Sequence, residues 1–187
     1  MKKILVVVDM QNDFIDGPLG TPEAREIVGK VCKKILGCEW NSIFATMDTH
    51  FDTYLETQEG RKLPIEHCIY GTHGQKLNEK IQEAITRYPK SLDKCVPVIK
   101  TRFGSTVLVE LLENFIHKTR EDLEITLVGI CTDICVISNA LMLKSYLPEA
   151  RIIVDASCCA GSSPEKHLMA LSVMESCQID ILNESEG

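Results

Sequence analysis

Residues 125–136 read Ile125-Thr126-Leu127-Val128-Gly129-Ile130-Cys131-Thr132-Asp133-Ile134-Cys135-Val136, and this stretch decides the fold. It begins as a short apolar, β-branched run, which is typical of a buried strand. A glycine and a Thr-Asp pair able to cap a helix follow, and apolar residues then recur at helical spacing. We therefore predict a strand that turns sharply into a helix, with Cys135 in or near the first helical turn. Free backbone N–H groups converge at such a turn and would stabilise a thiolate or an oxyanion.

Short apolar runs and helical stripes alternate on both sides of this stretch. Further strands are predicted at residues 3–8, 42–47, 96–99, 151–154 and 179–182. Helices are predicted at residues 22–37, 75–86, 106–115 and 133–145, with a last one beginning at Pro164, whereas residues 51–74 are polar and show little periodicity. This order indicates an α/β fold, a three-layer αβα sandwich with a mostly parallel sheet of about six strands. Residues 1–187 are predicted to form a single domain.

The composition excludes several kinds of partner. Of the 187 residues, 44% are apolar and 25% charged, as in an ordinary globular protein, and the net charge of −7 disfavours nucleic acid and membrane surfaces. No apolar run reaches the ~18–20 residues of a membrane span. The first eight residues resemble the start of a signal peptide, but Asp9 ends that run too early, so a first core strand is the better interpretation.

Nine cysteines are many for this length, and their number is odd. Several lie inside apolar runs rather than in loops suited to a disulfide framework. We therefore predict a reducing, cytoplasmic location in which most of them are small buried hydrophobic residues. Neither Cys131-x3-Cys135 nor the adjacent pair Cys158-Cys159 has the spacing of a good zinc or dithiol motif.

Polar residues stand where the predicted strands end: Asp9 after the first, Asp48 and His50 after the second, Lys100 after the third, and the Cys131–Cys135 turn after the fourth. Ligands of parallel sheets bind beyond the carboxyl ends of the strands, so these residues can meet at one edge. There Asp9 could accept the thiol proton of Cys135, and Lys100 could hold the thiolate by charge. The alternative is that Asp9 caps a turn, Lys100 is solvated and Cys135 packs in the core.

Three separated motifs carry a resemblance to a known family: Val8-Asp9-Met10-Gln11-Asn12-Asp13-Phe14, Ile99-Lys100 and Gly129-Ile130-Cys131-Thr132-Asp133-Ile134-Cys135-Val136. They resemble the isochorismatase-like cysteine hydrolases, and among these the nicotinamidase-related amidases. Asp48-Thr49-His50, His67-Cys68-Ile69-Tyr70-Gly71-Thr72 and the later Asp155…His167 segment extend the resemblance over nearly the whole chain. Three motifs in the right order are a specific signal.

The resemblance implies a role for each matching residue. Asp9, Lys100 and Cys135 match the catalytic triad of the family. Cys135 would attack an amide or related carbonyl to form a thioester acyl-enzyme, with Asp9 passing the thiol proton to the leaving amine. The family also has a non-proline cis peptide bond before the residue matching Cys131, so the resemblance implies a cis Ile130–Cys131 bond and an oxyanion site made by the backbone N–H groups of Cys131 and Cys135.

A metal site is the second expectation. In Asp48-x-His50 the two side chains point to the same side of an extended segment, and His67 follows later. One carboxylate and two imidazoles can hold Zn, Fe or Mn. Nicotinamidases bind a metal with an Asp-x-His pair and a later His, but the further histidine of many members is missing here, which leaves Glu59, preferred over Glu56, or water as the fourth ligand. The alternative is that His50 and His67 are polar loop residues without a metal.

Two aromatic residues, Phe14 and Phe103, match positions that form apolar walls of the substrate pocket in nicotinamidases; simple core packing is the alternative. The tryptophan that nicotinamidases often carry just before the metal-binding Pro-x-His-Cys is absent, and Leu63-Pro64-Ile65-Glu66-His67 stands there instead. The chain's only tryptophan, Trp40, lies far away in the sequence. This departure removes a stacking surface for a pyridine ring.

The leading hypothesis is a cytoplasmic cysteine amidohydrolase that acts on a small amide, with nicotinamide as the first candidate, a divalent metal and no organic cofactor. Another carbamoyl or ureido compound is the alternative substrate; the vinyl ether of isochorismate is disfavoured because isochorismatases proper typically lack the nucleophilic cysteine. A non-catalytic binding protein and a redox role for Cys131 and Cys135 are further alternatives. Family members are commonly dimers or tetramers, so a homo-oligomer is expected.

Overall fold

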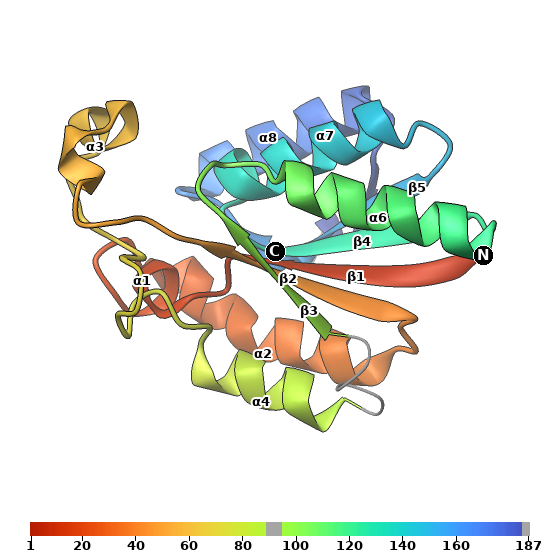
Figure 1. Cartoon of the computed structure of the whole chain (residues 1–187), viewed down its shortest axis with the longest axis horizontal. Coiled ribbons are helices and arrows are strands. Elements are labelled where there is room, and N and C mark those ends of the chain that lie inside the picture. Colours follow the sequence, from red (N-terminus) through yellow and green to blue (C-terminus); the bar gives the residue numbers. More distant parts are fainter. Residues whose placement is uncertain (89–94, 185–187) are drawn as a thin grey trace.

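Six parallel strands form the centre of the molecule, as seen in a computed structural model that describes residues 1–88 and 95–184 (Figure 1). Their order across the sheet is β3-β2-β1-β4-β5-β6. The strands are β1 (Lys2–Val8), β2 (Ser42–Asp48), β3 (Cys95–Lys100), β4 (Leu123–Ile130), β5 (Arg151–Ala160) and β6 (Asp180–Leu182). From β1 the chain first adds β2 and β3 on one side of the sheet and then β4, β5 and β6 on the other. The connections therefore leave in opposite directions at the boundary between β1 and β4. Ligands of doubly wound sheets bind at such a point.

Helices cover both faces of the sheet. The longer ones are α2 (Pro22–Gly37), α4 (Glu79–Arg87), α6 (Thr106–Thr119), α7 (Ile137–Tyr146) and α8 (Pro164–Ser176). Figure 1 shows α2 and α4 on one face and α6, α7 and α8 on the other. Two apolar cores follow from this, one on each face, because alternate residues of the buried strands point to opposite sides. The predicted three-layer αβα sandwich is confirmed.

Short helical segments lie beyond the carboxyl ends of the strands. They are α1 (Asn12–Ile15), the 3₁₀ turn η1 (Tyr54–Glu56), α3 (Gln58–Lys62) and the π-helical turn η2 (Thr132–Val136). Figure 1 places α1 and α3 at this end of the sheet. The sequence pattern predicted none of the first three, because a helix of one turn shows no period. No helix in the described part of the chain is long and apolar enough to cross a membrane.

Several elements differ from their predicted extent, among them β5 and α4. Strand β5 continues to Ala160, so Asp155 lies inside the strand rather than at its end. Buried Asp155 is tolerated there because Lys34 Nζ lies 2.7 Å from its Oδ2 and Ser157 donates a hydrogen bond to its Oδ1. Helix α4 begins at Glu79 rather than at residue 75, and the Asn78 side chain caps it by accepting a hydrogen bond from the backbone N–H of Lys80.

The turn from β4 into η2 depends on Gly129. Its φ is +126°, and a Cβ at this position would lie 2.1 Å from the carbonyl oxygen of Val8 on β1. The register between β4 and β5 also shifts between Leu127 and Gly129. Only glycine accepts this conformation and this close approach. The strand therefore brings the cysteine turn directly beside the end of β1.

Candidate active site

Three buried side chains meet at the carboxyl edge of the sheet. Asp9 follows β1, Lys100 is the last residue of β3, and Cys135 lies in η2. Lys100 Nζ lies 2.7 Å from Asp9 Oδ2 and 3.5 Å from Cys135 Sγ. The three residues are 0, 4 and 5% exposed. The structure therefore brings the predicted triad together and keeps it away from bulk water.

Asp9 is arranged to receive a proton from the thiol. Thr46 Oγ1 donates a hydrogen bond to Asp9 Oδ1 at 2.7 Å, and Lys100, which contacts Cys135 Sγ, lies 2.7 Å from Asp9 Oδ2. Burial raises the pKa of the Asp9 carboxyl, and the charge of Lys100 offsets only part of this effect. A carboxylate with a raised pKa is a stronger base than an exposed aspartate. Asp9 is thus suited to accept and later return a proton.

The cysteine is a thiol in the resting site. Burial and the nearby Asp9 raise the pKa of Cys135 well above its ordinary value, although Lys100 acts in the opposite direction. Burial alone would lower the pKa of Lys100, but Asp9, Cys135 and Asp48 together raise it. The ammonium group therefore keeps its charge. A proton could pass from Cys135 to Asp9 during attack, because Lys100 contacts both groups and would stabilise whichever of them is anionic.

The turn that carries the nucleophile is held by Asn139. The Ile130–Cys131 peptide bond is cis, as the resemblance implied. In the following π turn the backbone N–H of Val136 donates to the carbonyl of Cys131. The Asn139 side-chain amide donates to the carbonyl oxygens of Cys135 at 2.8 Å and Phe103 at 3.2 Å, and its Oδ1 accepts from the N–H of Ser105. Asn139 thus joins the nucleophile's turn to the loop that carries Phe103.

The proposed metal ligands form a second cluster beside the triad. The ligand atoms of Asp48, His50 and His67 all lie within 4.8 Å of one another, and all three residues are buried. Asp48 Oδ2 is 3.1 Å from His50 Nε2 and 3.7 Å from His67 Nε2. The other ring nitrogen of His67 is 2.8 Å from the carbonyl oxygen of Ile65, which leaves Nε2 for the cluster. This donor set fits a divalent metal.

The structure distinguishes the two glutamates considered for the fourth ligand. Glu59 Oε1 lies 3.8 Å from His50 Nε2, and Glu59 lines the cavity described below. Glu56 is exposed and does not line that cavity. The geometry therefore favours Glu59, which sits in the first turn of α3.

Residues of the first motif position this cluster. The Gln11 side-chain amide donates to the carbonyl oxygens of Asp48 and Gln75, and its Oε1 accepts from the N–H of Asp48. Asp13 Oδ2 accepts from the N–H of Cys68, directly after His67. Asp9 and Cys68 both have positive φ, 48° and 47°, which is rare for these residue types. The motif therefore positions both Asp9 and the loop that carries His67.

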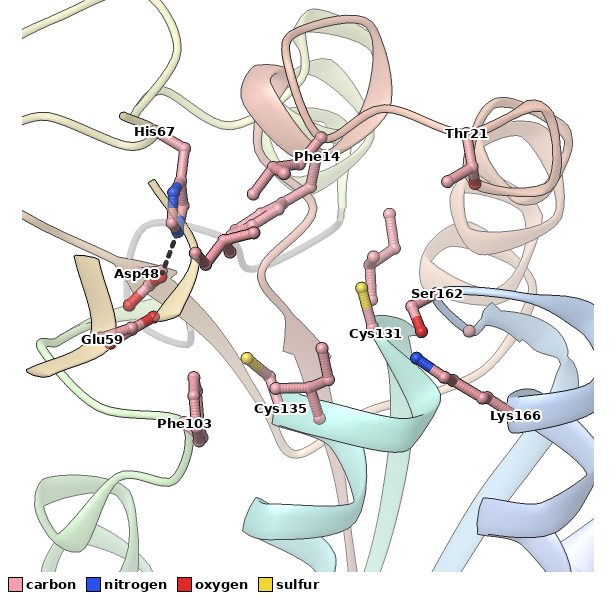
Figure 2. Close-up of a pocket in the computed structure, with 15 residues that line it drawn as sticks. Phe14, Thr21, Asp48, Glu59, His67, Phe103, Cys131, Cys135, Ser162 and Lys166 are labelled. Atoms are coloured by element: carbon pink, nitrogen blue, oxygen red, sulfur yellow. Dashed lines mark ion pairs between the residues drawn. The ribbon is translucent and has the colours of Figure 1, made fainter. Parts of the chain in front are cut away.

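A cavity of about 340 Å³ opens onto Cys135 (Figure 2). Phe14 and Phe103 line it, as predicted, together with Leu19, Leu63, Ile130 and Ile134. Asp48, Glu59 and His67 lie on one side in Figure 2, and Ser162 and Lys166 lie on the other. Trp40 does not line this cavity. It is buried elsewhere in the fold, beside Tyr88. The site is thus an apolar chamber with Cys135 at its base.

Replacing Thr46 by valine should move the acidic limb of the pH–activity profile to higher pH. The Thr46 hydrogen bond lowers the pKa of Asp9, so its loss raises that pKa further. With Asp9 as the expected base, activity should be present above the pKa of its carboxyl and be lost as the pH falls through that pKa. The measurement is kcat/KM between pH 4 and pH 8 for wild type and T46V, with T106V, a change at an exposed threonine of α6, as control. An unchanged acidic limb would contradict the assignment of Asp9 as the base.

Comparison with known proteins gives consistent matches. The model of the isochorismatase domain family matches residues 3–185. The nicotinamidase of Saccharomyces cerevisiae is 26% identical, and the match covers 87% of this chain and 91% of the yeast protein. The crystal structure of nicotinamidase PncA from Bacillus subtilis superposes with a TM-score of 0.81 at 26% identity, covering 98% of this chain and 100% of the other. The zinc complex of Pyrococcus horikoshii pyrazinamidase has the same fold, with a TM-score of 0.74, 23% identity and coverage of 97% and 99%.

Proposed function

Because the chain belongs to the isochorismatase family, in its nicotinamidase-related branch, we propose that it is a cysteine amidohydrolase with nicotinamide as its first candidate substrate. Its relatives named as nicotinamidases are hydrolases of an amide C–N bond, and this chain is a hydrolase of that class. The observation that supports the proposal most strongly is the contact of Lys100 with both Asp9 and Cys135, where Cys135 also lines an apolar cavity.

In the proposed mechanism the Cys135 sulfur attacks the amide carbonyl while Asp9 takes the thiol proton. The backbone N–H groups of Cys131 and Cys135 stabilise the oxyanion. Asp9 then protonates the leaving nitrogen, the C–N bond breaks, and ammonia departs from a thioester acyl-enzyme. Water attacks the thioester, gives a proton to Asp9, and releases the acid and the free thiol.

Asp48, His50, His67 and Glu59 are the residues that would hold a divalent metal in this proposal. A bound metal would act as a Lewis acid that orients a donor atom of the substrate. Asp48 also lies 3.3 Å from Lys100 Nζ, so one carboxylate links the metal-binding cluster to the triad. The zinc complex of the Pyrococcus horikoshii protein supports zinc as one possible metal.

The experiment that tests the proposed function is stoichiometric product analysis. Purified protein should convert nicotinamide to nicotinate and ammonia in a 1:1 ratio at neutral pH. Added hydroxylamine should divert part of the product to the hydroxamate, because it competes with water for a thioester. Turnover without hydroxamate would contradict the acyl-enzyme step, and absence of turnover on nicotinamide, pyrazinamide and benzamide would contradict the amidase itself.

Replacing Glu59 by glutamine should lower metal affinity by about tenfold or more, because one anionic ligand is lost. Glu56→Gln is the matched control, since Glu56 is exposed and lies in the same short segment. The measurement is zinc binding by competition with a chromophoric chelator, together with the rise of Tm that bound metal produces. Equal affinities of E59Q and E56Q would favour water as the fourth ligand.

The second candidate is hydrolysis of another small carbamoyl or ureido compound by the same steps. The absence of a tryptophan from the cavity wall favours it, because Leu63 there offers no aromatic face to a pyridine ring. Location in the cytoplasm and assembly into a homo-oligomer stay predictions from the cysteine content and the family resemblance.

A further inference from the structure

The cavity wall opposite the metal-binding cluster carries a lysine, Lys166, near the start of α8. Figure 2 shows its ammonium group directed toward the cavity beside Cys131 and Ser162. Burial raises the pKa of the Cys131 thiol to about 12, and the charge of Lys166 acts against that rise. Two observations, the cavity lining and this electrostatic effect, therefore place the charge next to the cavity.

Lys166 is an exposed residue at the rim of the cavity, and its place in the helix does not favour a cation. Lys166 is the third residue of α8, where a positive charge opposes the helix dipole. It forms no ion pair among the residues that the structure describes. The neighbouring carboxylate, Asp133, accepts hydrogen bonds from the N–H and the hydroxyl of Ser162, at 2.7 and 2.6 Å. The lysine is thus left without a carboxylate partner of its own in the described protein.

The charges of the cavity are distributed unequally. Asp48 and Glu59 lie on the metal side, and Lys166 is the only lysine or arginine among the described residues that line the cavity. The walls between the two sides are apolar, so a charged group of a ligand would be poorly solvated there. An anionic group of a ligand would be attracted by Lys166, whereas Asp48 and Glu59 on the other side offer it no cationic side chain among the cavity-lining residues. A neutral ring such as nicotinamide makes no use of this asymmetry.

We propose that Lys166 is a specificity-determining residue that binds a carboxylate of the substrate. The preferred substrates are then small amides or carbamoyl compounds that carry a carboxylate at the end remote from the scissile bond. This inference rests on the proposed amidohydrolase function and names its substrate class. The amide carbon lies at Cys135, and the carboxylate lies toward α8, away from Asp48 and Glu59.

The test uses two pairs of substrates that differ in charge: succinamate with butanamide, and 3-carbamoylbenzoate with nicotinamide. Wild type should show a KM about tenfold lower for the charged member of at least one pair. Lys166→Met should raise that KM about tenfold while changing kcat less than threefold, and it should leave the neutral amides unaffected. Lys166→Arg should restore most of the difference. The matched control is Lys118→Met, since Lys118 is an exposed lysine of α6 that does not line the cavity.

Added salt gives an independent readout, because the KM for the charged substrates should rise with ionic strength in wild type but not in K166M. Turnover of neutral amides combined with no effect of K166M on either charged substrate would overturn the carboxylate site and leave the amidase standing. Equal losses by K166M on charged and neutral substrates would indicate a structural role and would also overturn it. No turnover of any of the four amides would overturn the proposed function together with this inference.

Discussion

Cys135→Ala should lower kcat/KM for the best amide substrate by a factor on the order of 10⁴ or more, because covalent catalysis is lost together with its nucleophile. Alanine removes only the sulfur, and the site is small and buried, so the fold should survive. The measurement is ammonia release under identical conditions for wild type and variant, with circular dichroism to show that the variant is folded. The hydroxamate formed in the presence of hydroxylamine should disappear as well.

Cys131→Ala is the matched control for this loss. Cys131 lines the same cavity, but its proposed role uses only the backbone N–H, which alanine retains. The variant should keep activity within about threefold of wild type. Equal rates of C135A and wild type would remove Cys135 from the mechanism, and an equally large loss in C131A would show that the Cys131 thiol takes part.

Lys100→Met should abolish activity and also lower the free energy of unfolding by about 3–5 kcal/mol. Lys100 and Asp9 form an ion pair in which both side chains are at most 2% exposed, and Asp48 shares the same cation. Removing the lysine leaves buried carboxylates without a counter-charge, which is the costly way to break such a pair. Urea denaturation at pH 7 measures the stability, and amide turnover measures the activity.

The double variant Asp9→Asn/Lys100→Met separates the two effects. It removes one uncompensated carboxylate, so about half or more of the lost stability should return, whereas activity should stay lost. Lys118→Met controls for the loss of a lysine from the surface. A K100M protein as stable as wild type would mean that the ion pair contributes nothing to folding.

The sequence predicted which residues meet in the site because the positions of polar residues along the chain determine where they lie in a parallel sheet. Parallel strands end at one edge, so polar residues that follow apolar runs lie close together. Asp9, Asp48 and Lys100 were found this way, and the glycine before the cysteine turn indicated the sharp bend. The family resemblance was needed to assign His67 and Phe103, which lie in segments without a recognisable period.

Residues that hold the site in place could not be predicted, because their partners depend on register and on local irregularity. Thr46 contacts Asp9 only because β1 and β2 pair with Val8 opposite Thr46. Asn139 reaches the carbonyl of Cys135 through a π turn, which an ideal helical period does not reveal. Lys166 carries no sequence signal, since none of its neighbours in the chain indicates a cavity.

The position of Asn139 has a consequence for attempts to change the substrate range. One amide group bonds both to the turn of the nucleophile and to the loop whose Phe103 forms a wall of the chamber. We therefore expect that altering that loop to widen the chamber also shifts the turn that carries Cys135. Selectivity and reactivity are not independent variables in this protein, and a successful redesign would have to vary residues 103 and 139 together.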